Sequence, residues 1–102
     1  MSRGDIFWHE PPEEPTRPVL VLTRQAGTEV MAKVLAVPAT TSARGIPTEV
    51  RLGTQDGMPK DCVLSLDNLA PVRKAHLTRR ITTLSAGRLA EVCQALRDAT
   101  DC

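Results

Sequence analysis

The residues best suited to chemistry are polar side chains at points where strands are expected to run into loops. They are Arg17, the run Thr40-Thr41-Ser42 and the pair Asp67-Asn68. Strand ends that meet at one rim of a small barrel would gather these groups into a single site. Residue type alone also allows an ordinary interpretation. Strand-end arginines are often solvated, and Asp-Asn pairs often cap turns through side-chain hydrogen bonds.

The residues that usually bind metals do not indicate metal catalysis. His9 and His76 are far apart in the sequence, and neither is surrounded by carboxylates at metal-ligand spacing. The acidic run Glu10, Glu13 and Glu14 is typical of a solvated loop. The sequence also lacks a glycine-rich phosphate loop, a nucleophile elbow and a Cys/His dyad. We therefore expect neither a metal ion nor another cofactor.

Short β-branched and leucine-rich runs predict the strands that position these residues. Segment 10–16 is proline-rich and acidic, which predicts a stiff loop that cannot pair in a sheet. Gln25–Thr28 is expected to turn the chain. Polar loops are expected at 38–45 and 55–61, and strands at 5–9, 18–23, 30–37, 47–52 and 62–66.

The last part of the chain predicts a helix that packs on the sheet. Ser85 suits the N-cap position. One face then carries apolar residues at helical spacing, namely Leu89, Val92, Cys93 and Leu96. Residues 72–80 are expected to form one helical turn, followed by a short strand around Ile81. Several short strands and one late helix indicate a mostly-β fold, a small barrel of antiparallel strands.

The composition indicates one globular domain over residues 1–102. Hydrophobic residues make up 41% of the chain and charged residues 25%. The aromatic residues are Phe7 and Trp8, so bound RNA cannot lie on a row of stacking rings, as it does on RRM or OB platforms. The core must consist of Val, Leu, Ile and Ala. A domain of this size with so few large side chains is marginal alone, which favours a homodimer.

The charge is unevenly distributed, although the net charge is only +1. Residues 1–16 carry one arginine against four acids, a net charge of −3. Residues 17–60 carry six Lys or Arg against three acids, a net charge of +3. The middle of the chain is therefore electropositive, which permits a polyanion site without requiring one.

The three cysteines, Cys62, Cys93 and Cys102, are odd in number and widely spaced, which predicts reduced thiols. Cys62 and Cys93 lie in apolar runs and are expected to fill the core, and Cys102 is expected to be exposed. The start of the chain has no apolar stretch typical of a signal sequence, and no apolar run approaches the roughly 20 residues of a membrane span. We expect a cytoplasmic protein.

An ordered set of motifs covers nearly the whole chain and resembles the MazF/PemK toxin family of endoribonucleases, also called mRNA interferases. The ordered set is far more specific than any single motif. It consists of Arg3–Trp8, Thr16–Leu22, Val37–Thr41, Ile46–Val50, Cys62–Asn68 and Arg80-Ile81 leading to Leu84-Ser85, before a closing helix.

The resemblance implies a small SH3-like β-barrel of the PemK/CcdB type with a C-terminal helix. It implies a homodimer, a cognate antitoxin protein and metal-independent cleavage of single-stranded RNA at short sequences. The essential arginine of the family precedes the proline of the R-P-V strand, which places that role on Arg17. The essential threonine follows the V-P-x element, which places that role on Thr40.

The chemistry of these two side chains fits the implied roles. Metal-free RNA cleavage uses the neighbouring 2′-OH as nucleophile, so RNA is cut and DNA is spared. The Arg17 guanidinium can hold two phosphate oxygens and stabilise charge building at phosphorus. The Thr40 hydroxyl is too weakly acidic to serve as a base, so it is expected to donate a hydrogen bond to the phosphoryl group.

The general base is expected in the loop before Arg17. Many family members carry a glutamate five positions ahead of the arginine, where this chain has Pro12. Glu13 and Glu14 are the nearest acids, and either is a candidate base. Other members carry a histidine in this loop, but His9 lies at the end of the first strand instead.

The remaining predictions concern recognition. Trp8 is a candidate anchor for an antitoxin peptide. An alternative function is a non-enzymatic barrel toxin that binds and inhibits a protein target such as DNA gyrase. Candidate RNA contacts are Thr41, Ser42, Arg44, Lys60 and Asn68, with Arg79 and Arg80 as further possible phosphate contacts.

Overall fold

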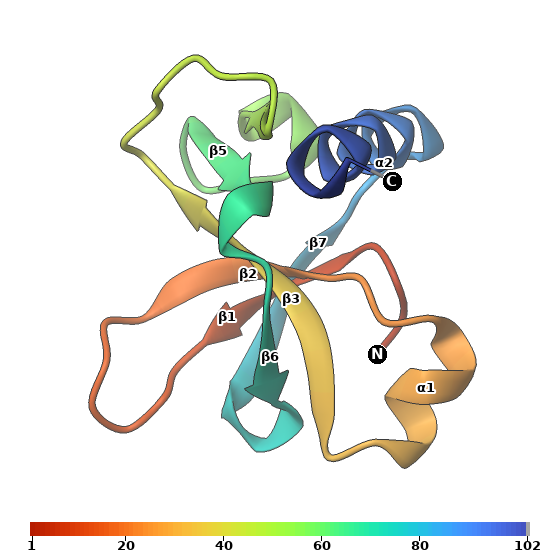
Figure 1. Ribbon diagram of the computed structural model, residues 1–102. Helices are drawn as coiled ribbons and strands as arrows, with labels where there is room; N and C mark the ends of the chain where they lie inside the picture. The colour runs from red at the N-terminus through yellow and green to blue at the C-terminus, as the bar shows by residue number, and fades with distance from the viewer. Residues whose placement is uncertain (102) are drawn as a thin grey trace.

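The computed structural model describes residues 1–101 and shows one curved sheet with two helices (Figure 1). The helices are α1 (Gln25–Val30) and α2 (Ala86–Thr100). Short 3₁₀ helices occupy Thr54–Asp56, Leu66–Asn68 and Lys74–His76. The strands are β1 (Asp5–His9), β2 (Arg17–Val21), β3 (Lys33–Thr40), β4 (Glu49–Leu52), β5 (Cys62–Ser65), β6 (Ala70–Arg73) and β7 (Leu77–Thr83).

The sheet is antiparallel, with the strand order β4-β5-β3-β2-β1-β7. The long strand β3 changes partner on one side, because its first half pairs with β6 and its end pairs with β5. Strands β4 and β7 end the sheet and do not pair with each other. The predicted mostly-β domain with a C-terminal helix is confirmed, but the sheet is open and is a barrel only in a loose sense.

The core is aliphatic, as the composition required. Ile6 on β1, Leu20 on β2, Val37 on β3 and Leu64 on β5 are fully buried. Val92 of α2 reaches the same cluster, so the helix closes one side of the core. The Ser85 hydroxyl accepts a hydrogen bond from the Arg88 backbone N–H at 3.2 Å, which confirms the predicted N-cap.

The strands expected at 5–9, 18–23, 47–52 and 62–66 are confirmed to within a few residues. The turn predicted at Gln25–Thr28 is wrong, because these residues begin α1. A glycine in a short polar segment is typical of a turn, but Gly27 lies inside this helix. A side chain there would meet the Thr23 methyl group at 2.7 Å, so this helix needs a glycine where sequence rules expect a turn.

The strand expected at 30–37 is shifted, since β3 runs from Lys33 to Thr40. Val30 and Met31 are exposed, so the apolar alternation began before the strand did. The loop expected at 38–45 therefore begins later. Pro38 continues the strand because it lies between the pairing segments of β6 and β5, where the missing N–H breaks no ladder on that side.

Residues 72–80 were predicted with partial success. The helical turn is present as the 3₁₀ helix Lys74–His76, but it separates β6 from β7, and β7 is longer than the short strand expected around Ile81. Cys102 lies outside the described residues. Within residues 1–101, neither helix combines the length and apolar character that a membrane crossing requires.

Candidate functional site

Arg17 and Thr40 lie at the same end of two neighbouring strands in the middle of the sheet. Strand β2 begins at Arg17 and the antiparallel strand β3 ends at Thr40, so the strand pairing brings the two residues together. Both residues line two neighbouring hollows, a first hollow of about 300 Å³ and a second of about 510 Å³. The two predicted catalytic side chains therefore share one location.

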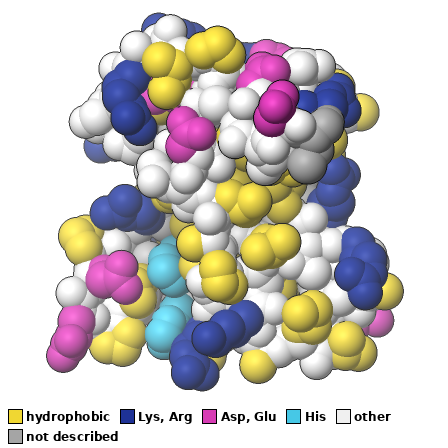
Figure 2. All heavy atoms as spheres, in the orientation of Figure 1, with side chains coloured by type: hydrophobic (Ala, Val, Ile, Leu, Met, Phe, Trp, Pro, Cys, Tyr) yellow, Lys and Arg dark blue, Asp and Glu magenta, His cyan; other side chains and the backbone are white. Residues whose placement is uncertain are grey.

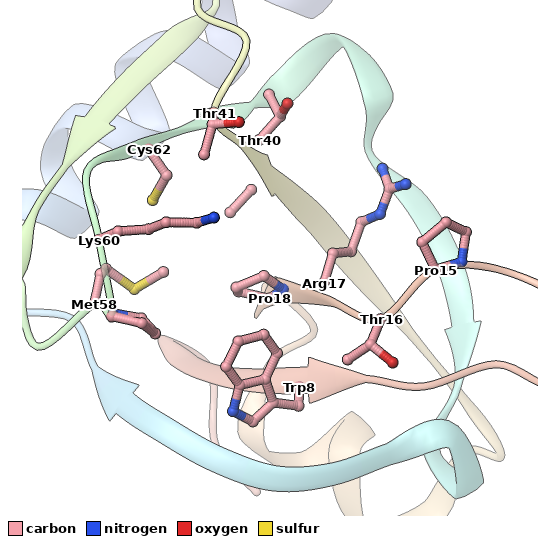
Figure 3. Close-up of a pocket in the computed structure, with 12 residues that line it drawn as sticks. Trp8, Pro15, Thr16, Arg17, Pro18, Thr40, Thr41, Met58, Lys60 and Cys62 are labelled. Atoms are coloured by element: carbon pink, nitrogen blue, oxygen red, sulfur yellow. The ribbon is translucent and has the colours of Figure 1, made fainter.

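The first hollow has a mixed wall of apolar and cationic side chains (Figure 3). Trp8 lies on one side of it, Thr40 and Thr41 lie on the other, and Lys60 reaches between them. No carboxylate is among the described residues that line this hollow. Its lining residues are Trp8, Pro15, Thr16, Arg17, Pro18, Ala39, Thr40, Thr41, Met58, Pro59, Lys60 and Cys62.

The second hollow gathers polar groups from four segments. Arg17 and Thr40 are joined there by Pro38, Ser42, Arg44, Glu49, Ser65 and Asn68. Ser42, Arg44 and Asn68 are thus in this hollow, while Thr41 and Lys60 are in the first one. All five predicted RNA contacts are therefore placed around the two predicted catalytic residues.

The loop after Thr40 is held by hydrogen bonds to side chains at both ends. The Ser42 backbone N–H donates to the Thr40 hydroxyl at 3.1 Å. The Arg44 and Gly45 backbone N–H groups each donate to a Glu49 carboxylate oxygen at 2.9 Å. The Glu49 side chain is only 5% exposed. Desolvation opposes its ionisation, but the backbone donors outweigh this effect and lower the pKa of Glu49 below its ordinary value.

The Asp67-Asn68 pair divides into a structural and a site residue. The Thr48 hydroxyl donates to the Asp67 carboxylate at 2.6 Å, which ties the loop before β4 to the turn after β5. The Asn68 amide nitrogen donates to the buried Ser65 hydroxyl at 2.8 Å, and Asn68 lines the second hollow. The side chain of Asp67 therefore links two segments and is not seen to cap a turn by bonding to the backbone of a described residue, while Asn68 lines the hollow.

The candidate bases Glu13 and Glu14 line a different, third hollow of about 590 Å³. They share it with His9 and His76, whose ring centres are 6.1 Å apart; the cyan histidine side chains are neighbours in Figure 2. His9 is also the strand partner of Arg17. Desolvation lowers the pKa of His9, with support from the charges of His76 and Arg17 and opposition from Glu14.

Sequence reasoning missed the apolar wall of the first hollow. Met58, Pro59 and Pro18 complete that wall around Trp8. Cys62 was expected to fill the core but is half-buried in the same wall, and burial raises the pKa of its thiol. The sequence offered only a weak signal for this wall, because a proline-methionine loop carries no recognisable motif.

The two arginines of β7 do not join the site. Arg79 lines a separate hollow with Glu10, and the Arg80 side chain donates to the Thr83 hydroxyl at 2.8 Å. In the part of the chain that the structure describes, no three His, Cys, Asp or Glu side chains cluster as metal ligands would. The chemistry available at this end of β2 and β3 is phosphate binding by Arg17, with hydroxyl donors beside it.

The chain is similar to known proteins in both sequence and structure. Residues 2–100 match the family described as PemK-like, MazF-like toxin of type II toxin-antitoxin system. The chain is 39% identical to "Probable endoribonuclease MazF2" of Mycobacterium tuberculosis over 103 residues, covering 100% of both chains.

Solved structures give the same picture. The Mycobacterium tuberculosis toxin MazF-mt6 superposes with a TM-score of 0.87 at 31% identity, covering 95% of this chain and 96% of that one. A mycobacterial endoribonuclease in complex with its cognate antitoxin superposes with a TM-score of 0.89 at 25% identity, covering 99% and 95%. The resemblance drawn from the ordered sequence motifs is confirmed.

Proposed function

The chain belongs to the PemK-like, MazF-like family of type II toxins, and from this premise we propose that it is a sequence-specific endoribonuclease that cuts single-stranded RNA without a metal ion and independently of the ribosome. The observation that carries the proposal is that Arg17 and Thr40 lie at the same end of the paired strands β2 and β3. Arg17 and Thr40 line the same two hollows there.

In the proposed mechanism the RNA supplies its own nucleophile. The 2′-OH attacks the adjacent phosphorus and the bond to the 5′-oxygen breaks, which leaves a 2′,3′-cyclic phosphate. The departing 5′-oxygen takes a proton from water and becomes a 5′-hydroxyl end. Arg17 holds the phosphate oxygens through two parallel hydrogen bonds and stabilises the charge that builds there. Thr40 donates a hydrogen bond to the same phosphoryl group.

The proton of the 2′-OH passes to a base in the loop between β1 and β2, which we assign to Glu13 or Glu14. His9 lines the same hollow and is the strand partner of Arg17, so the loop lies near the phosphate-binding residue. Glu14 lies close enough for its charge to act on His9. Thr41, Ser42, Arg44, Lys60 and Asn68 contact the RNA on either side of the cut phosphate.

The working unit in this proposal is a cytoplasmic homodimer of a single domain spanning residues 1–102, held in check by a cognate antitoxin. A related endoribonuclease was solved with its antitoxin, which supports a similar partner for this chain. The relatives named as endoribonucleases do not favour the alternative, a non-enzymatic toxin that inhibits a protein target such as DNA gyrase.

The test is incubation of the purified protein with mixed single-stranded RNA in EDTA. We expect cutting at a short recurrent sequence, and products that end in a 2′,3′-cyclic phosphate and a 5′-hydroxyl. A matched single-stranded DNA should stay intact, because it lacks the 2′-OH. RNA that remains intact at micromolar protein, or cutting that requires added Mg²⁺, would contradict the proposal.

A further inference from the structure

We propose that Trp8 forms a subsite for one nucleobase in the first hollow, where its indole ring stacks on the base next to the phosphate held by Arg17 and Thr40. This inference rests on the proposed function and names what the same site recognises. It differs from the antitoxin anchor expected for Trp8 from the sequence.

The position of the ring is fixed by the sheet. Trp8 lies on β1 directly opposite Pro18 of β2, and the side chain is half-buried rather than free to turn into solvent. Met58, which is 3% exposed, and Pro59 line the hollow with it. Apolar surfaces around an aromatic face suit a flat, stackable group, and a ring already held in place loses little entropy on binding.

The size of the hollow limits what it holds. At about 300 Å³ it accommodates one planar base and not a series of them. Trp8 is also its one aromatic side chain among the described residues. A single ring with no neighbouring ring gives one stacked base, which agrees with the exclusion of an extended stacking platform from the composition.

The charge around the ring favours a nucleotide. The cations of the first hollow are Arg17 and Lys60, and its described lining contains no carboxylate. Trp8 also borders another hollow, but there Glu10 offsets the charge of Arg79, so that wall carries no net positive charge to attract a phosphate. Because Arg17 and Thr40 line the same hollow as the indole, a base on the ring stays attached to the phosphate that these residues hold.

Intrinsic fluorescence tests this subsite without requiring cleavage. Trp8 is the only tryptophan and the chain has no tyrosine, so the emission reports on this ring alone. The probes are short 2′-O-methyl oligoribonucleotides of mixed sequence, which a 2′-OH mechanism cannot cut, and abasic chains of the same length. We expect the oligoribonucleotides to quench Trp8 emission and protect it from acrylamide, and the abasic chains to do neither.

Substitutions test the same contact through cleavage of mixed single-stranded RNA. Loss of one stacked base corresponds to a fall in kcat/KM of about 5- to 150-fold for Trp8→Leu, while Trp8→Phe, which keeps a ring, should stay within about 3-fold. Phe7→Leu is the matched control, because Phe7 is the adjacent aromatic on β1 and lines none of the described hollows. Circular dichroism checks that each variant is folded.

Three outcomes separate the possibilities. Equal quenching by base-containing and abasic chains overturns the subsite, whichever variants fold. Unchanged RNA cleavage by folded Trp8→Leu also overturns it. Base-dependent quenching by a protein that cuts no RNA would support the subsite while the proposed nuclease function fails.

Discussion

Two loops border the predicted catalytic residues Arg17 and Thr40, and they are held in place by different means. The loop from Thr41 to Thr48 is fastened by hydrogen bonds, because the Thr40 hydroxyl and the Glu49 carboxylate accept from its backbone. The loop at 11–16 has no side-chain hydrogen bond among the described residues, and its order comes from three prolines that restrict the backbone dihedral angles.

This difference between the two loops predicts how well each one tolerates substitutions. A hydrogen-bonded loop fixes the positions of Thr40 and Ser42, so a substitution there displaces groups that must meet the phosphate. A loop stiffened by proline keeps its path when a single side chain changes. We therefore expect substitutions in the fastened loop to be severe one at a time, and those in the acidic loop to be severe only in combination.

The largest effects should follow removal of the phosphate-binding groups themselves. Arg17→Ala and Thr40→Ala should each lower the RNA cleavage rate by about 10²–10³-fold, because each removes a donor to the charge that builds in the transition state. The same variants should no longer arrest growth when expressed. Arg97→Ala, an exposed site on α2, is the control. Retained toxicity of both folded variants would contradict the site assignment.

The next largest effect is expected for Glu13 and Glu14 in the acidic loop at 11–16, where single substitutions should be milder than in the hydrogen-bonded loop at 41–48. Because Glu13 and Glu14 line the same hollow, each can replace the other as base, so Glu13→Gln or Glu14→Gln should reduce the rate only modestly. The double variant should lose about 10²-fold, the lower end of what a positioned base contributes. Rates measured across pH for the double variant and for His9→Gln decide the matter. A loss confined to His9→Gln would assign the base to His9 instead.

The sequence predicted most of the sheet because β-branched runs and proline-rich loops leave few alternatives. It failed at residues 25–37, where local rules and packing disagree. Gly27 lies in a helix, where a Cβ would meet the Thr23 methyl group at 2.7 Å, and Val30 is exposed although its pattern indicates a buried strand. In both cases the surroundings of the residue in the folded chain, rather than its type, decided the local structure.

The site was predictable to the extent that strand pairing decides it. Arg17 and Thr40 occupy strand ends, and an antiparallel pair places those ends together. The placement of Glu13 and Glu14 in a separate hollow was not predictable, because β6 and His76, which are distant in sequence, form the rest of its wall. The wall around Trp8 was also missed, since Met58 reaches it from a loop distant in sequence.

Removing the charge of Glu49 tests whether its hydrogen bonds hold the 41–48 loop in place. Glu49→Gln keeps the shape but removes the charge that attracts the N–H groups of Arg44 and Gly45, so we expect a lower Tm at neutral pH and a cleavage rate about 10-fold lower. The folded state lowers the pKa of Glu49 below its ordinary value of 4.5. Its stabilisation is therefore present above pH 4.5 and is lost as the pH falls through the lower, folded value.

Thermal melts across this range show whether the charge matters. The unmodified protein should lose stability on acidification partly through Glu49, and Glu49→Gln should show a shallower decline below pH 4.5. Thr48→Ser, which keeps the hydroxyl that donates to Asp67 in the same loop, is the matched control. Parallel acid curves for Glu49→Gln and the unmodified protein would show that hydrogen bonds to Glu49 do not fasten the loop.

The smallest effect is expected at the ion pair of Arg88 and Asp56. Neither residue lines the first hollow, but Asp56 belongs to the loop that carries Met58 into its wall. Arg88 of α2 donates from Nε to the Asp56 carboxylate at 2.9 Å, and the Gly53 backbone N–H donates to the same carboxylate at 3.0 Å. The Arg88 hydrogen bond is the main cause of the lowered pKa of Asp56. Asp56→Asn should cost about 1 kcal/mol of stability above pH 3.8, with the loss vanishing as the pH falls through the folded pKa.

Because Asp56 precedes Met58 in the same loop, this variant shows how far the wall around Trp8 depends on its support. If the loop keeps its path, Asp56→Asn should change RNA cleavage by less than about 2-fold, in contrast to Glu49→Gln. Asp98→Asn, an exposed carboxylate on α2, controls for the change in charge. A loss of activity as large as that of Glu49→Gln would show that the 54–61 loop is held as strictly as the 41–48 loop, and that hydrogen bonds order both walls of the site.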